Sequence, residues 1–502
     1  MIKRRDFIKA VGLGLTSVCL TGTKLIADTI DCRSQRPNVV AIVTDDLAEW
    51  AMGAYGNREV HTPNLDRIAN EGMLFTNSFV LTPVCSPSRA TYFSGLYPTQ
   101  HTITDFLDEN ESFDVMGYKS LTWPAVLRDH GYATALVGKW DLGLLPRFFP
   151  TRHGFDHFFG YLSDSPSKMD PEFEVSSDFV KTPASLSGGG YPLPRSEIDG
   201  KMQQFKGALP DVLTNNAMAF MKANKDKPFA LLLHFQAPHD PYLPLPKQDL
   251  AHYRDLDPTV PEFDGADVEQ LKQTTKEYYA AVSAADRNVG RVLDFLDEHN
   301  LSDNTLVLFT SDNGENIGQH KIEGKGNGRW IAGGIEGAPQ IPNMWDTSIR
   351  VPLVMRWPGV IKKGIRSEHM ISNLDIFRTV LGSLNVPVPK GKSIRGTDFS
   401  PLLRGKTVKQ PDAIFGQYDL HNEAIGYLRM IRTRRWKYVH HFHTNFMHEL
   451  YDLKNDPEES NNLMTRRGPE PGSIDPWTFK QLNGRLIEWM RSIDDPLLND
   501  PY

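Results

Sequence analysis

The chain contains very little cysteine: three residues in 502, at Cys19, Cys32 and Cys85. Domains that depend on disulfides carry many more, so a packed hydrophobic core must stabilise this fold. Cys19 lies in an apolar N-terminal stretch, which leaves a Cys32–Cys85 disulfide as a formal possibility. Such a bridge would consume Cys85, the residue at the centre of the most informative motif.

An excess of positive charge is also missing. The 55 Lys and Arg residues face 62 Asp and Glu residues, which gives a formal net charge of −7. Domains that bind nucleic acids carry basic surfaces, so this balance argues against a nucleic-acid partner. If the substrate is an anion, local Lys, Arg and His side chains and a cation must attract it.

Long hydrophobic runs are absent, and we expect no stable membrane span. The N-terminus carries Arg4-Arg5-Asp-Phe-Ile-Lys, followed by a short apolar stretch from Val11 to Leu20. This pattern is typical of an export signal, and the arginine pair indicates the twin-arginine type, with a Sec-type signal as the alternative. We therefore interpret residues 1–34 as an export signal and expect a periplasmic or extracellular protein.

Apolar strands and helices alternate along most of the remaining sequence. Strands buried on both faces are expected at residues 37–44, 74–80, 133–137, 228–235, 304–310 and 351–358, with helices at 63–72, 122–130 and 267–299. This alternation predicts an α/β fold, in which helices cover both faces of a large, mostly parallel sheet. We assign residues 35–400 to this catalytic domain, with a long surface insertion at 164–207.

A smaller C-terminal subdomain is predicted over residues 410–502. A polar linker, residues 391–412, precedes it. Short strands at 413–418, 427–432, 436–439 and 449–452 lie close together in sequence and predict an antiparallel sheet. An amphipathic helix at 475–493 completes the subdomain.

The most informative motif is Cys85-Ser-Pro-Ser-Arg89, which opens an apolar run that ends at Gly95. Pro87 suits the first turn of a helix, and Gly95 suits the residue just past its end. Cys85 is therefore expected at a helix N-terminus, where free N–H groups favour an anion, with Arg89 one turn later on the same face. A buried cysteine beside a turn fits these five residues equally well.

Polar residues follow several predicted strands: Asp45-Asp46, Lys139, His239 and Asp312-Asn313. In open α/β sheets, ligands bind at the carboxyl edge of the strands. Adjacent carboxylates repel each other, so a cation between them is the economical explanation of the Asp pair, and a solvated turn is the alternative.

The Cys-x-Pro-Ser-Arg pattern resembles the signature of the type I sulfatases, in the alkaline-phosphatase-like superfamily. The family signature usually continues with Leu-Thr-Gly, where this chain has Phe93-Ser94-Gly95. The resemblance extends from about Pro37 to about Leu463. It implies that a formylglycine-generating maturase oxidises Cys85 to formylglycine (3-oxoalanine).

The resemblance also implies a metal site and a set of catalytic groups. The metal ligands would be Asp45, Asp46, Asp312, Asn313 and the modified residue 85. Oxygen donors without a soft ligand suit a hard cation, Ca²⁺ before Mg²⁺. Lys139 and Lys325 resemble the lysines that bind sulfate, Arg89 holds the site, and His239 resembles the histidine that protonates the leaving oxygen.

Asp141 departs from the family, which usually has histidine at this position after Lys-Trp. An aspartate can accept a hydrogen bond and act as a base, but it cannot donate while ionised. We expect Asp141 to assist the release of sulfate from residue 85.

The resemblance implies a sulfatase that cleaves sulfate esters, with sulfated carbohydrates as the substrate class. A phosphate or phosphonate ester hydrolase of the same superfamily is the nearest alternative. A non-catalytic binder of sulfated glycans is a second, indicated only by Asp141. A thiol hydrolase that uses unmodified Cys85 lacks a supporting arrangement of His and Asn.

The export signal can be tested by changing its arginine pair. Arg4→Lys with Arg5→Lys should leave a precursor in the cytoplasm, because the twin-arginine signal requires both guanidinium groups. Immunoblots of cell fractions measure this, with Arg33→Lys and Arg36→Lys as the charge-matched control. Unchanged export of the Arg4/Arg5 variant would indicate a Sec-type signal instead.

Overall fold

The computed structural model describes most of the chain after Gln35. The described residues are 36–107, 119–143, 145–162, 174–176, 204–206, 208–334, 340–422, 425–443 and 446–499. The expected export signal, with Cys19 and Cys32, lies outside them, as does most of the insertion at 164–207. Arg36–Tyr502 form one compact unit.

An eight-stranded sheet forms the centre of this unit, in the order β14-β2-β13-β8-β1-β7-β3-β4. The strands are β1 Asn38–Asp45, β2 Met73–Phe79, β3 Ala133–Lys139, β4 His157–Tyr161, β7 Phe229–Pro238, β8 Thr305–Ser311, β13 Leu353–Arg356 and β14 Ile365–Ser372. Neighbouring strands run parallel except at β13, which is antiparallel to both β2 and β8. The predicted mostly parallel sheet is confirmed.

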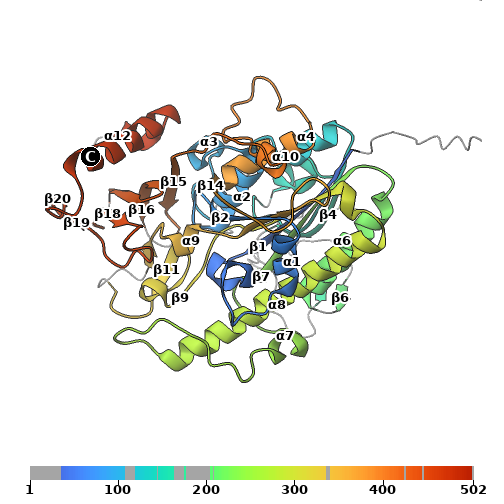
Figure 1. Cartoon of the computed structure of the whole chain (residues 1–502), viewed down its shortest axis with the longest axis horizontal. Coiled ribbons are helices and arrows are strands. Elements are labelled where there is room, and N and C mark those ends of the chain that lie inside the picture. The colour runs from blue at the N-terminus through green and yellow to red at the C-terminus, as the bar shows by residue number, and fades with distance from the viewer. Residues whose placement is uncertain are drawn as a thin grey trace, which may run out of the picture. The chain divides into compact units, whose positions relative to one another are not determined.

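Helices cover both faces of the sheet, as the alternation of elements predicted (Figure 1). One face carries α2 Cys85–Ser94, α4 Trp123–Asp129 and α10 Ile376–Ser383, and the other carries α1 Pro63–Asn70, α6 Leu209–Asn224 and α8 Val268–Glu298. Successive β1 side chains divide between two hydrophobic cores: Val39 and Ala41 pack on the first face, Val40 and Ile42 on the second. A strand buried on both faces therefore needs the continuous apolar run seen in the sequence.

The C-terminal region has the predicted antiparallel sheet. Its strands β15 Ala413–Leu420, β16 Gly426–Thr433, β17 Trp436–Phe442 and β18 Glu449–Asp452 pair in sequence order, and α12 Pro476–Ser492 packs on them. The stretch interpreted as a linker contains one short helix, α11 Ser400–Leu403.

The sequence analysis missed a second small antiparallel sheet. It consists of β9 Asn316–Ile317, β10 Ile322–Gly324, β11 Asn327–Trp330 and β12 Gln340–Pro342. Strands of two to four residues are too short to show an alternating pattern. This sheet matters because Lys325 lies in the turn between β10 and β11.

The remaining α-helices and strands in the described ranges are short. They are α3 Pro98–His101, α7 Lys247–Ala251, α9 Asp346–Ile349 and the strand pairs β5 Glu174–Ser176 with β6 Gln204–Lys206 and β19 Met464–Thr465 with β20 Gly468–Pro469. None of the helices in the described ranges combines the length and the apolar character that crossing a bilayer would need.

Arg429 holds the C-terminal sheet to the segment that follows α12. Its side chain is fully buried, with Nε 2.5 Å from Asp495 Oδ2 and Nη1 2.5 Å from Asp419 Oδ1. Removing the cation would leave two carboxylates without their buried partner.

We therefore predict that Arg429→Met lowers the free energy of unfolding by about 3–5 kcal/mol, the usual cost of breaking a buried ion pair. Chemical denaturation measures the change. Arg435→Met is the matched control, because the Arg435 side chain is half exposed and its pair with Asp452 should contribute far less to stability. Equal effects in both variants would contradict the role of Arg429.

Candidate active site

Cys85 is the first residue of α2, as the sequence predicted. Gly95 ends the helix in the left-handed conformation, with φ at 63°, and every residue between them is buried. The Cys85 side chain is a free thiol, and burial raises its pKa well above the ordinary value. The Sγ atom lies 3.9 Å from Lys325 Nζ, so a cationic group faces it directly.

Four of the five predicted metal ligands meet at the carboxyl ends of β1 and β8. Asp45 is the last residue of β1 and Asp46 follows it, and Asp312 and Asn313 follow β8, which pairs with β1 in parallel. The backbone N–H of Asp46 donates to Asp312 Oδ1 at 3.2 Å, and Asn313 Nδ2 donates to Asp46 Oδ1 at 2.6 Å. All four are at most 3% exposed.

Two oxygen atoms of this acidic cluster lack hydrogen-bond partners in the described part of the chain. They are Asp45 Oδ1 and Asn313 Oδ1, and both are buried. Buried acceptors are normally satisfied, so two orphaned oxygens beside two further carboxylates fit a hard cation. Atoms of Asp45, Asp46 and His239 that could bind metal also lie within 4.8 Å of one another.

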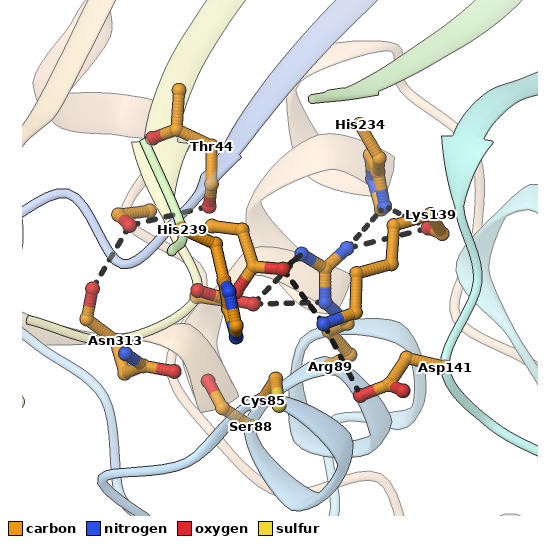
Figure 2. A network of polar contacts seen from close by, with 12 residues as sticks. Thr44, Cys85, Ser88, Arg89, Lys139, Asp141, His234, His239 and Asn313 are labelled. Carbon is orange, nitrogen blue, oxygen red and sulfur yellow. Dashed lines mark hydrogen bonds and ion pairs between the residues drawn. The ribbon is translucent and has the colours of Figure 1, made fainter. Parts of the chain in front are cut away.

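Three cationic side chains form ion pairs with the acidic cluster, and Figure 2 shows two of them, Lys139 and Arg89. Lys139 Nζ lies 2.7 Å from Asp45 Oδ2, Lys325 Nζ pairs with Asp46 Oδ1, and Arg89 Nη2 lies 2.7 Å from Asp312 Oδ2. Burial alone would raise the pKa of Asp45, but the nearby cations, Lys139 first, hold it well below its usual range. At Asp312 the nearby Arg89 does not offset these effects. Burial and the charge of Asp45 raise the pKa of Asp312 to about 7.

Asp141 faces the start of α2 from the end of β3. It has a positive φ of 61°, and its Oδ2 accepts a hydrogen bond from Ser86 Oγ at 2.8 Å. Ser86 in turn accepts from the backbone N–H of Leu107 at 3.0 Å, which directs the hydroxyl proton toward Asp141. Lys139 Nζ is 3.9 Å from Asp141 Oδ2, farther than from Asp45.

His239 lies at the open side of the cluster. Its Nδ1 is 2.6 Å from the Asp240 carbonyl oxygen, and its Nε2 is 3.6 Å from Asp46 Oδ2. Burial is the largest single effect and lowers the pKa of His239, but the charges of Asp46 and Asp45 together leave the net pKa raised. A raised pKa suits a group that must carry a proton.

The structure thus brings together every site residue that the sequence predicted. It also adds His234, which the sequence analysis missed. This histidine is fully buried on β7, and its Nδ1 lies 3.0 Å from Arg89 Nη1. The only signal was one polar residue inside the apolar run Phe229–Phe235.

Comparisons with known proteins agree with this arrangement. The Sulfatase family model matches residues 37–386, and the model described as N-sulphoglucosamine sulphohydrolase, C-terminal, matches residues 342–474. An ulvan-active sulfatase of Formosa agariphila is 30% identical, over 90% of this chain and 81% of that protein. An N-acetylglucosamine-6-O-sulfatase of Bacteroides thetaiotaomicron is 27% identical, over 86% and 83%.

The fold of this chain is also similar to that of a solved structure. That structure is a complex of a protein with its substrate D-glucosamine-2-N,6-O-disulfate, and it superposes with a TM-score of 0.72 at 25% identity. The superposition covers 93% of this chain and all of the other. From the fold, the site and these matches, the chain belongs to the sulfatase family of the alkaline-phosphatase-like superfamily and is a sulfuric ester hydrolase.

Proposed function

We propose that this protein hydrolyses sulfate esters of sulfated carbohydrates, with formylglycine made from Cys85 as the nucleophile and Ca²⁺ as the metal. One observation carries the proposal: Cys85 begins a buried helix beside Lys325 and a cluster of oxygen ligands with two orphaned acceptors. A thiol that burial keeps protonated is a poor nucleophile, which favours a modified side chain at this position.

The acidic cluster would hold the cation through Asp45, Asp46, Asp312 and Asn313, together with the modified residue 85. When bound, Ca²⁺ would lower the pKa of a hydroxyl on residue 85 and offset negative charge on the sulfuryl oxygens. Mg²⁺ is the less favoured ion, because it demands a stricter octahedral geometry.

The remaining groups have separate tasks. Lys139 pairs with Asp45 and Lys325 pairs with Asp46, and both lysines would bind the sulfuryl oxygens of the substrate. His239, with its raised pKa, would give its proton to the leaving alcohol oxygen. Asp141 would accept the proton of the second hydroxyl on residue 85 as sulfate leaves.

Sulfated glycans are the substrate class that the relatives support, since their names specify an N-acetylglucosamine 6-sulfate ester and ulvan. A steryl-sulfatase of Homo sapiens, 26% identical, makes a steroid sulfate the control substrate. The proposal includes export through the twin-arginine signal and maturation by a formylglycine-generating enzyme.

Phosphate or phosphonate ester hydrolysis remains the competing activity. Members of the superfamily that use zinc bind it with several histidines, whereas the four cluster ligands here offer only oxygen. Matched sulfate and phosphate esters of one alcohol distinguish the two activities. We expect the sulfate ester to have the higher kcat/KM.

The nucleophile is tested by Cys85→Ala. In protein produced with a maturase, the tryptic peptide that contains residue 85 should carry an aldehyde and be lighter than the thiol form. Cys85→Ala should lose sulfatase activity, measured as sulfate released from a panel of sulfated sugars. Cys85→Ser, matched in size, should equally be inactive with a maturase specific for cysteine. Full activity in Cys85→Ala would rule out the proposed nucleophile.

The role of Asp141 is tested by Asp141→Asn, which keeps the size of the side chain and removes the base. The first step should still proceed, so rapid-quench kinetics should show a burst of alcohol followed by slow turnover. If Asp141 serves only to orient Lys139, the burst itself should slow and KM should rise. Ser86→Ala, which removes the hydrogen bond to Asp141, should slow turnover less than Asp141→Asn does.

A further inference from the structure

His234 is a buried polar group that the proposed chemistry does not use. It lies on β7, five residues before His239, and its side chain is fully enclosed. We propose that His234 is a positioning residue: its Nδ1 fixes the Arg89 guanidinium, and through it the Asp312 carboxylate, relative to residue 85. The inference rests on the proposed function, because it assigns one more residue to the same site.

The hydrogen-bond pattern determines which imidazole nitrogen carries the proton. Arg89 Nη1 lies 3.0 Å from His234 Nδ1, and a guanidinium can only donate. The hydrogen bond from Arg89 therefore requires Nδ1 to accept and the proton to lie on Nε2. We take this tautomer because the Lys139 carbonyl oxygen, the other polar atom beside Nδ1, is farther away at 3.2 Å. Within the described residues Nε2 has no hydrogen-bond partner, so Nδ1 is the one atom of this ring that makes a polar contact with Arg89.

Acceptors hold the Arg89 guanidinium at both ends (Figure 2). Asp312 Oδ2 lies 2.9 Å from Nε and 2.7 Å from Nη2, at one end of the group. At the other end, Nη1 reaches His234 Nδ1 at 3.0 Å and the Lys139 carbonyl oxygen at 3.3 Å. The two protons on Nη1 therefore have two acceptors, and the planar group cannot turn about its contact with Asp312.

The close approach of β3 and β7 makes this contact possible. Gly138 on β3 pairs with His234, and a Cβ at Gly138 would lie only 1.8 Å from the His234 carbonyl oxygen. Gly138 also has a φ of 113°, which other residues rarely adopt. The glycine therefore lets β3 bring the Lys139 carbonyl oxygen beside His234 Nδ1, where Arg89 Nη1 reaches both acceptors, at 3.3 and 3.0 Å.

Loss of the hydrogen-bond acceptor at position 234 should disturb Asp312, one of the proposed metal ligands, through Arg89. One buried N–H of Arg89 would be left unpaired, and the guanidinium would be free to turn toward another acceptor. Since the same guanidinium contacts Asp312, that carboxylate would lose its fixed orientation. Groups that orient metal ligands in this way typically change metal affinity or activity by about 10–100-fold.

If His234 served only to pack the core, loss of its acceptor would not change metal affinity or activity. The His234 ring stacks on Phe93, with ring centroids 5.7 Å apart and an interplanar angle of 28°. If packing alone matters, His234→Leu should be the mildest change, and a small polar residue should be the most harmful. If the Nδ1 acceptor matters, His234→Leu should be among the most harmful changes, and a small polar residue with an acceptor near the position of Nδ1 should be the mildest.

The experiment compares three variants of the mature, full-length protein: His234→Asn, His234→Gln and His234→Leu. Asn places its amide oxygen near the position of Nδ1, Gln places it near Nε2, and Leu offers no acceptor. The probes are Ca²⁺, titrated by calorimetry, and 4-nitrophenyl sulfate with N-acetylglucosamine 6-sulfate, assayed for kcat and KM. Thermal unfolding reports on packing.

We expect His234→Leu and His234→Gln to lower kcat and Ca²⁺ affinity by about 10–100-fold, with KM changed less than kcat. His234→Asn should recover to within about threefold of the wild-type protein even if its melting temperature is the lowest of the three. If His234→Leu does not fold, the comparison of Asn with Gln still decides the question. Equal kcat and equal Ca²⁺ affinity in Asn and Gln, or wild-type values in Leu, would overturn the assignment.

Failure of the proposed function would give a different result. If the wild-type protein cleaved neither ester but bound Ca²⁺, the order of Ca²⁺ affinities would still test His234. If the wild-type protein cleaved an ester and the variants matched it, only the inference about His234 would be wrong. A wild-type protein that bound no Ca²⁺ would contradict the inference, because Asp312 would then have no metal to position.

Discussion

The whole site depends on the burial of three carboxylates at one edge of a sheet. Asp45, Asp46 and Asp312 are at most 3% exposed, and charges so placed are costly unless they are paired. Lys139 forms its shortest ion pair with Asp45, Lys325 with Asp46 and Arg89 with Asp312. Two acceptor oxygens, Asp45 Oδ1 and Asn313 Oδ1, nevertheless have no hydrogen-bond partner among the residues that the structure describes. A divalent cation would satisfy both and would leave the lysines free to bind an anionic substrate.

Parallel pairing explains why these residues meet. The strands β8, β1, β7 and β3 are neighbours in one sheet, and all four run in the same direction. The residues that follow them therefore lie at a single edge, where α2 presents Cys85. Because these strands are buried on both faces, the packed sheet holds the groups at their ends in place, whereas Lys325 comes from the turn between β10 and β11.

Much of this could be predicted from the sequence. Continuous apolar runs such as Asn38–Asp45 indicate doubly buried strands, and the helix begins at Cys85 because Pro87 and Gly95 mark its ends. The β9–β12 sheet could not be predicted, because its strands are too short for any periodic pattern. Nor could the contact of His234 with Arg89, since 145 residues separate them and only the packed sheet brings them together. Asp141 was identified by position, but its hydrogen bond from Ser86 needed the structure.

The central claim is that the acidic cluster binds a divalent cation, and thermal unfolding of the chelated protein with and without added Ca²⁺ tests it most directly. A ligand that binds only the folded state at 100 times its Kd stabilises it by about 2.7 kcal/mol. The account predicts a rise in melting temperature for the wild-type protein and a much smaller rise for Asp46→Asn. Asp303→Asn, a change outside the acidic cluster, should respond like the wild-type protein. A wild-type melting temperature that is the same with and without Ca²⁺ would contradict the account.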